Sequence, residues 1–238
     1  NAYTYAPSVV TAFVAATATK VSVYVFLRFV FTIFGADFAF GTMHIDYLLL
    51  PLAIAGIFVA SAVAIYQSNL KKLLAYSSVA QIGYIMLGIS FGSITGLTAG
   101  IVHLFNHALM KGALFLAVGS IFLRVNSVQL DDLSGLGKRM PVTSFALVLG
   151  GLGLIGVPLT VGFISKWYLL LAAIEAGWWP VAVLVLISSL LALVYIWRFV
   201  ETAYFRPVPD DAPPVSEAPL LMQIPMWLLI ALAIGLGI

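Results

Sequence analysis

Long apolar runs, separated by short polar stretches, are the main pattern along this 238-residue chain. Most of these runs reach the roughly 20 residues that a helix needs to cross the hydrocarbon core of a bilayer. The seven runs cover residues 9–34, 46–66, 73–92, 97–123, 142–174, 180–204 and 222–238. They do not alternate apolar and polar positions, which favours helices over a transmembrane β-barrel. The pattern therefore predicts an all-α polytopic membrane protein, with residues 1–238 forming a single transmembrane domain of about seven helices.

The fifth run, 142–174, is too long for one straight membrane helix. Its 33 residues would extend about 50 Å, against a hydrocarbon core of about 30 Å. Four glycines precede Pro158 in its middle and Gly162 follows it, and proline both removes a backbone donor and clashes with the preceding turn. We therefore expect a discontinuous helix, broken near 156–162 at Gly156, Pro158 and Gly162; a proline kink in a tilted span is the alternative. In transporters, unwound backbone at this depth marks the ion path.

Composition narrows the class of protein further. Hydrophobic residues make up 63% of the chain and charged residues 8%, with a net charge of +2, whereas a soluble domain is about one quarter charged. These values exclude a soluble enzyme and a disordered regulator, and the lack of a large basic patch excludes a nucleic-acid partner. The absence of cysteine excludes disulfides, thiolate zinc sites and cysteine-ligated iron–sulfur clusters. We expect no cofactor, no metal and no catalytic residue in the chain itself.

Basic residues between the apolar runs fall on one side of the predicted bundle. The six that define this side are Lys71, Lys72, Arg124, Lys138, Arg139 and Arg206. The opposite loops, 35–45 and 93–96, and the turn at Gly177 contain no Lys or Arg. The positive-inside rule therefore places the basic side, and residue 1 with it, on the cytoplasmic side of a cell (inner) membrane.

Residues 206–219 form a polar stretch between the last two apolar runs. Their sequence, RPVPDDAPPVSEAP, holds five prolines and three acidic residues. Because proline cannot continue a helix, this stretch predicts an extended, proline-rich cytoplasmic linker. Just before it, Arg198 precedes Glu201 by three residues, a spacing that predicts an ion pair on one helix face.

Five basic or titratable residues, which we call the interior row, lie inside the predicted spans: Lys20, His103, His107, Lys111 and Lys166. A lysine at the bilayer centre costs at least ~2.5–3.5 kcal/mol, so the three lysines are expected to face the interior of the bundle. The two histidines and Lys111 recur every four residues, which places them on one helix face at intervals of about 6 Å. Because histidine titrates near neutrality, this series indicates a proton relay.

Polar groups on neighbouring spans could connect the interior row. The candidates are Thr17, Thr19, Ser22, Ser77, Ser78, Asn106 and Ser165. Three other interpretations stay open. His103 and His107 have the i, i+4 spacing of a metal-binding pair, although no third ligand follows nearby in the sequence. The lysines could instead hold the bundle together through buried hydrogen bonds, and the chain could belong to a redox or quinone-binding subunit.

Three segments, in order, resemble a known family. They are KKLLAYSSVAQIGYIMLGI (Lys71–Ile89), HLFNHALMKGALFLAVGSI (His103–Ile121) and GVPLTVGFISKW (Gly156–Trp167). These segments resemble the proton-conducting, antiporter-like membrane subunits of respiratory complex I, membrane-bound hydrogenases and multisubunit Mrp sodium/proton antiporters. The resemblance implies that the chain is the second inverted repeat of such a subunit. Because it begins at Asn1 without Met and stops within an apolar run, we expect the C-terminal portion of something longer.

The resemblance implies a role for each member of the interior row. Lys20 matches the bridging lysine of the family's eighth helix, and Lys166 matches the terminal lysine of its second broken helix. The two histidines and Lys111 match the connecting residues of the eleventh helix. The implied function is proton translocation through this row, within a complex of membrane subunits that includes homologous ones. Sodium is a further candidate ion.

Two features favour one branch of the family. The lysine at position 166 stands where one complex I member has a glutamate. Paired histidines followed by a lysine suit the Mrp D type or the distal subunit of complex I. The sequence therefore favours a subunit of a cation/proton antiporter of the Mrp type. The alternative is a proton-pumping membrane-arm subunit of complex I, the NADH:quinone oxidoreductase, or of a membrane-bound hydrogenase.

Overall fold

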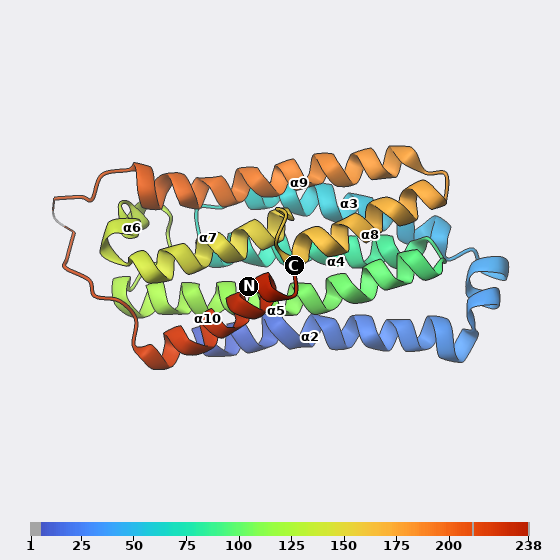
Figure 1. Cartoon of the computed structure of the whole chain (residues 1–238), viewed down its shortest axis with the longest axis horizontal. Coiled ribbons are helices and arrows are strands. Elements are labelled where there is room, and N and C mark those ends of the chain that lie inside the picture. The colour runs from blue at the N-terminus through green and yellow to red at the C-terminus, as the bar shows by residue number, and fades with distance from the viewer. Residues whose placement is uncertain (1–5, 211, 238) are drawn as a thin grey trace.

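The computed structural model describes residues 6–210 and 212–237, and these residues form an elongated bundle of helices (Figure 1). Apart from one bridge between Asn69 and Gln129, they contain helices and loops only. In chain order the helices are α2 (Ser8–Arg28), η1 (Phe29–Phe34), η2 (Asp37–Thr42), α3 (Asp46–Ile65), α4 (Leu70–Ser90), α5 (Ile94–Val125), η3 (Asp131–Leu133), α6 (Leu136–Arg139), α7 (Pro141–Ile155), α8 (Val161–Glu175), α9 (Trp179–Val200), η4 (Glu201–Phe205) and α10 (Leu220–Gly235). The predicted all-α fold is confirmed.

Five helical segments are long and apolar enough to cross a membrane. They are Val10–Phe34, Asp46–Ile65, Leu70–Ser90, Ile94–Val125 and Trp179–Phe205. Two shorter apolar helices, α7 and α10, overlap the fifth and the seventh predicted runs. The chain is therefore a multi-pass membrane protein.

Local sequence explains where several helices begin. The side chain of Asn69 accepts a hydrogen bond from the backbone N–H of Lys72 at the start of α4 (3.1 Å). Ser93 does the same for the N–H of Gly96 at the start of α5 (3.1 Å). Each bond satisfies one of the backbone donors that the first turn of a helix leaves free. Proline stands in the first turn of both α7 and α9, where its missing N–H costs nothing.

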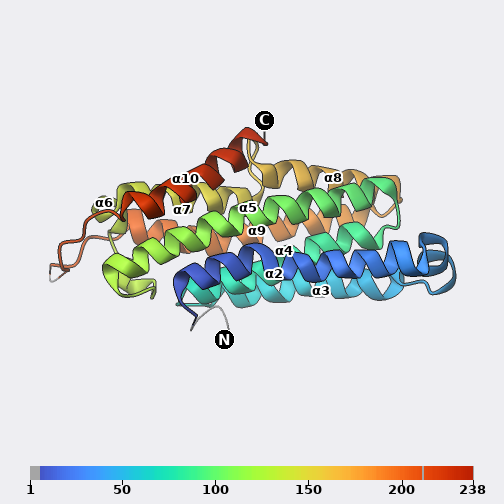
Figure 2. The same cartoon turned by 90° about the horizontal axis from the view of Figure 1, so that it is seen from below.

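Helix α5 lies at the centre of the bundle. It packs against α2, α4, α7, α8 and α10, and Figures 1 and 2 show it running along the long axis between them. Helices α7 and α8 follow one another end to end beside it, so that the gap between them lies near the middle of the bundle. Because of its central position, α5 buries polar side chains along its whole length, His103 and Lys111 among them.

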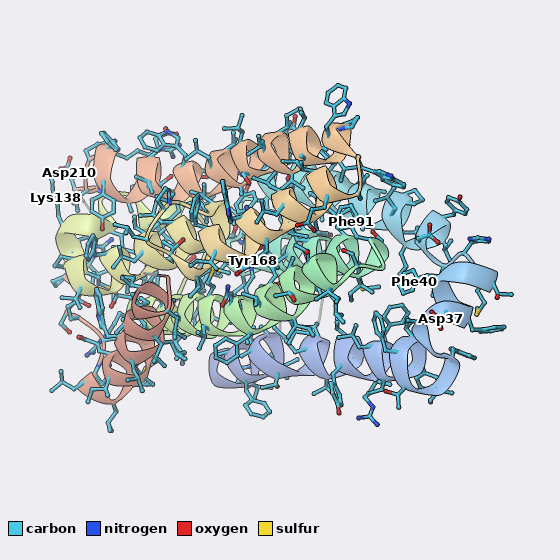
Figure 3. The ribbon with its side chains drawn as sticks, turned by 45° about the vertical axis from the view of Figure 1, so that its right-hand side comes forward. Asp37, Phe40, Phe91, Lys138, Tyr168 and Asp210 are labelled. Carbon is cyan, nitrogen blue, oxygen red and sulfur yellow. The ribbon has the colours of Figure 1, made fainter. Side chains whose placement is uncertain are left out.

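The two ends of the bundle differ in charge. Figure 3 shows Lys138 and Asp210 at one end, with Asp37, Phe40 and Phe91 at the other. The predicted 206–219 linker lies at the basic end, and its described residues contain no helix. Basic side chains bind this linker: Arg139 donates to the carbonyl of Pro213 (2.8 Å) and Arg124 to that of Glu217 (3.0 Å).

Glu217 ties the linker to the first turn of α7. Its carboxylate accepts hydrogen bonds from the N–H of Val142 (2.6 Å), the N–H of Thr143 (3.4 Å) and the Thr143 hydroxyl (2.7 Å). The carboxylate therefore caps the N-terminus of α7 from a residue far along the chain, and its negative charge suits the positive end of the helix dipole. This contact holds the segment that leads into α10 against the start of α7.

The predicted pair between Arg198 and Glu201 is wrong. The Arg198 guanidinium donates to the carbonyls of Ile65 and Gln67 at the C-terminal end of α3, and Glu201 instead lies 3.6 Å from Arg206. The last carbonyls of a helix have no partner within that helix. Arg198 gains more by donating to them than by forming an exposed ion pair with Glu201, because exposed ion pairs contribute little to stability.

Candidate ion-translocation site

The three members of the interior row on α5 lie on one fully buried face. His103, His107 and Lys111 are each 0% exposed. The rings of His103 and His107 are nearly parallel, at 13°, with their centroids 6.4 Å apart. The four-residue spacing therefore stacks these side chains along α5 inside the bundle, as the sequence predicts.

His103 is bonded at both ring nitrogens. Its Nδ1 lies 2.8 Å from the Ser165 hydroxyl on α8, and its Nε2 lies 2.9 Å from Oε1 of Gln81 on α4. The amide nitrogen of Gln81 donates to the carbonyl of Leu154 (3.5 Å). Because a carbonyl can only accept, the amide oxygen must be the atom that faces His103, and Nε2 must therefore carry a proton. The Nδ1 atom is the position at which this imidazole gains or loses charge.

Lys111 bonds to α4 rather than to an acidic residue. Its ammonium donates to the carbonyl of Leu74 (2.8 Å) and to the Ser77 hydroxyl (2.5 Å). Lys20, 7% exposed on α2, donates to the carbonyl of Ala15. Lys20 is close enough to His107 and to Lys111 to act on both electrostatically. Both lysines therefore bond neutral groups and repel one another, and no residue in the described ranges offers either of them a bonded carboxylate.

His107 differs from its neighbours on α5. Among the residues that the structure describes, neither of its ring nitrogens has a hydrogen-bond partner. A buried imidazole without a partner costs free energy. The middle of the interior row is therefore the part that fixed protein groups stabilise least.

The fifth apolar run is interrupted, as predicted. Helix α7 ends at Ile155 and α8 begins at Val161. Gly156 turns the chain with a φ of 85°, and Leu159, directly after Pro158, has a φ of 70°, a region that non-glycine residues rarely adopt. A kinked single helix would keep negative φ angles throughout, so the chain is broken here rather than bent.

Lys166 caps the end of the broken α7. Lys166 is 5% exposed. Its ammonium donates to the carbonyls of Leu154 (3.1 Å) and Ile155 (2.8 Å) and to the Ser189 hydroxyl on α9 (2.9 Å). It also lies 4.7 Å from the centre of the Tyr84 ring. The last carbonyls of a helix carry partial negative charge. The break thus creates the acceptors that hold a lysine inside the membrane domain.

Gly162 permits the two half-helices to meet. A Cβ atom at this position would lie 1.8 Å from the carbonyl oxygen of Gly153 on α7. Asn106 on α5 adds a second connection, because its amide nitrogen donates to the carbonyl of Val161 (2.6 Å). At the break, α7 and α8 are therefore in backbone contact with each other, and the first residue of α8 is hydrogen-bonded to α5.

A cleft of about 270 Å³ adjoins the break between α8 and α9. Lys166 and Ser189 are its polar lining residues, and apolar side chains such as Phe163 and Leu190 form much of the rest. Lys166 and Ser189 therefore face this mostly apolar cleft at the end of the interior row.

Several polar residues around the row were not predicted from the sequence. Gln81, Tyr84, Ser188 and Ser189 were not among the expected connecting groups, yet the Tyr84 hydroxyl lies 2.6 Å from that of Ser188. Their signal is nonetheless present in the sequence, because Ser77, Gln81 and Tyr84 recur at helical spacing in an otherwise apolar run.

The seven expected connecting residues divide into two groups. Ser77, Ser165 and Asn106 bond as described above. The others do not bond the row: Thr17 and Ser22 donate to carbonyls of their own helix on the exposed side of α2, Ser78 donates to the carbonyl of Leu74 (3.0 Å), and the Thr19 hydroxyl has no partner among the described residues. The sequence could not separate the two groups because α2 has polar residues on more than one face.

Similarity to known proteins agrees with this arrangement. A family described as NADH:quinone oxidoreductase/Mrp antiporter, transmembrane, matches residues 1–192. The chain belongs to this family. The NADH-quinone oxidoreductase subunit N of Desulforudis audaxviator is 39% identical over 250 aligned residues, which cover 100% of this chain and 48% of that protein. The chain therefore spans about half the length of this family relative.

Two solved structures from multisubunit membrane complexes share the fold. A chain of the Mrp complex from a Dietzia species superposes with a TM-score of 0.91 at 26% identity, covering 99% of this chain and 51% of that one. A chain of the archaeal membrane-bound sulfane sulfur reductase gives 0.89 at 31% identity, covering 99% and 40%. Further curated family members are also named subunit N. These names favour the complex I alternative, and they do not support the Mrp D type that the sequence favours.

Proposed function

We propose that this chain carries protons across a membrane along the interior row, as part of an antiporter-like subunit. The observation that carries the proposal is the placement of three lysines and two histidines inside an apolar bundle. Within the described part of the chain, the lysines bond carbonyls and hydroxyls and no carboxylate. A structural lysine in a membrane domain gains most from an acidic partner that neutralises it. Cations held by neutral acceptors alone can lose and regain a proton without breaking an ion pair.

His103 supports the proposal because its partners suit two protonation states. When Nδ1 is unprotonated, the Ser165 hydroxyl can donate to it. When Nδ1 is protonated, it donates to Ser165, and that hydroxyl turns to the carbonyl of Gly162 (3.2 Å) or Val161 (3.3 Å) of its own helix. Both states keep every polar group bonded, so that His103 can change charge with little reorganisation.

Charge repulsion within the row supplies the order of proton movement. Lys20 acts electrostatically on His107, Lys111 and His103, and Lys166 acts on His103. Positive charge at one position therefore disfavours it at the next. Alternating occupancy along the row would pass protons toward Lys166, which lines the cleft between α8 and α9.

The names of the curated relatives favour a quinone-linked complex, rather than an Mrp antiporter, as the assembly in which this chain moves protons. We propose that the subunit pumps protons beside other membrane subunits, homologous ones among them, in a cell membrane. In this proposal the basic end, with Lys138 and the 206–219 linker, faces the cytoplasm, in accordance with the positive-inside rule. Residue 1 lies outside the described residues.

Replacing Lys111 with methionine tests the proposal against a purely structural role. Methionine keeps the length and apolar stem of lysine but removes the charge. In the assembled complex we expect proton movement in sealed vesicles to fall at least about tenfold, with assembly near the wild-type level. A complex that fails to assemble, or one that assembles and moves protons at the wild-type rate, would contradict the proposal. Lys72→Met, at the surface end of α4, is the matched control.

A further inference from the structure

A buried tyrosine on α9 lies beside the interior row without belonging to it. Tyr195 is 0% exposed, and its hydroxyl has no hydrogen-bond partner in bonding geometry among the described residues. A buried phenol normally finds a partner, because leaving the hydroxyl unbonded costs free energy. The Tyr84 hydroxyl on α4 lies 2.6 Å from that of Ser188 on α9. Two turns further along these antiparallel helices, the Tyr195 hydroxyl faces α4 near the side chains of Ser77 and Gln81.

Each of these two side chains already serves one member of the row. Ser77 accepts from Lys111 (2.5 Å), and Gln81 accepts from Nε2 of His103 (2.9 Å). Ser77 and Gln81 are one helical turn apart and are 0% and 1% exposed. The polar side chains that bond the two ends of the α5 series therefore lie on α4 beside Tyr195, whereas His107 on α5 itself has no bonded partner among the described residues.

We propose that the Tyr195 hydroxyl is a hydrogen-bond switch that couples the protonation of Lys111 to that of His103. This inference rests on the proposed function, because it assumes that both groups change charge during turnover. Among the described residues the Tyr195 hydroxyl has no hydrogen bond to either of them. It acts through Ser77 and Gln81, so it is a positioning residue.

The direction of the coupling follows from the acceptors. When Lys111 is protonated, it donates to the Ser77 oxygen, whose own proton can reach the carbonyl of Leu74 (3.0 Å). The single proton of the Tyr195 hydroxyl is then donated to Oε1 of Gln81, which accepts from both Tyr195 and Nε2–H of His103, and the shared acceptor weakens the bond that supports a charged imidazole. When Lys111 is neutral, Tyr195 turns to Ser77 and leaves Oε1 to His103. The switch therefore makes charge at Lys111 disfavour charge at His103 by about the free energy of one hydrogen bond.

Substitution of Tyr195 by phenylalanine removes the hydroxyl and little else. In vesicles that contain the assembled complex, we expect Tyr195→Phe to lower the rate of proton movement about tenfold, the equivalent of one hydrogen bond. The solvent deuterium isotope effect on that rate should rise, because a proton-transfer step becomes limiting. Loss of packing alone would lower the amount of complex without changing the isotope effect. Tyr204→Phe, at the exposed end of the same helical segment, is the matched control.

A double variant tests whether Ser77 and Tyr195 act as one device. We expect Ser77→Ala combined with Tyr195→Phe to be no slower than Ser77→Ala alone, since both changes interrupt the same connection. If the double variant is slowed by the product of the two single effects, Ser77 and Tyr195 act independently and the switch is overturned. A wild-type rate and a wild-type isotope effect in Tyr195→Phe would also overturn it. If Lys111→Met blocks proton movement while Tyr195→Phe does not, the switch fails and the proposed function stands. If Lys111→Met has no effect, the proposed function itself fails.

Discussion

Replacement of Lys166 by alanine is expected to abolish proton movement by the assembled complex, with a loss of at least about a hundredfold. Lys166 is the member of the interior row that adjoins both the chain break and the cleft. Its ammonium joins the last carbonyls of α7 to Ser189 on α9. Alanine removes the charge, so that a proton arriving from His103 finds no group to receive it beside the cleft. Proton movement is followed with a pH-sensitive dye in sealed vesicles during turnover.

Two controls separate this role from a structural one. Lys138→Ala removes an exposed lysine at the basic end and should leave both assembly and proton movement unchanged. Lys166→Met fills most of the volume that alanine leaves, so it should restore any loss of assembly but not the transport. Wild-type proton movement in either Lys166 variant would refute the role of this residue. Restoration of transport by methionine would show that packing, and not charge, matters there.

Replacement of Gly162 by alanine should have the largest effect on folding. The added Cβ would lie 1.8 Å from the carbonyl oxygen of Gly153, and the clash is with backbone, which cannot rotate away as a side chain would. Helices α7 and α8 would have to separate at the break, at a cost of about 3 kcal/mol, the upper end of what overpacking usually costs. We expect little or no assembled complex in membranes, as measured by the amount extracted and by its thermal stability.

Gly56→Ala is the matched control for this experiment. Gly56 lies within α3, and a Cβ atom there would meet nothing within 4 Å among the described residues. Because alanine is favoured over glycine inside a helix, this variant should assemble at least as well as the wild type. Equal amounts of complex from Gly162→Ala and Gly56→Ala would show that the contact between the half-helices is dispensable.

The sequence predicts the parts of this structure that depend on periodicity and chain length. Apolar runs of membrane-spanning length predict the helices, and an overlong run with Pro158 in its middle predicts the break. The four-residue spacing of His103, His107 and Lys111 predicts their common face, because a helix of 3.6 residues per turn leaves no other arrangement. Each of these inferences concerns residues that are close together along the chain.

Contacts between distant segments could not be predicted in the same way. Gln81 bonds His103 and Leu154, which belong to two other helices, and nothing near Gln81 in the sequence indicates that it faces them. Arg198 has an acidic residue three positions away, yet it bonds the end of α3. The choice among partners depends on how the helices rotate about their axes. That rotation is set by packing across the whole bundle.

The residues of the interior row also do not distinguish one branch of the family from another. A lysine at position 166 and paired histidines favour an Mrp antiporter, whereas the curated relatives are named subunit N. The half-helix that ends at Ile155 explains why these residues discriminate poorly. Its free carbonyls provide a cation site that any member with a lysine at this position can use, whatever drives the complex.

The most direct test of proton translocation through the interior row is to measure the number of protons moved per turnover after all three of its lysines have been replaced. Lys20, Lys111 and Lys166 are replaced together by methionine, and protons are counted against substrate consumed in sealed vesicles with the assembled complex. We predict that the complex assembles and that every proton carried through this subunit is lost from the ratio. An unchanged ratio in the triple variant would contradict a role for the row in proton movement.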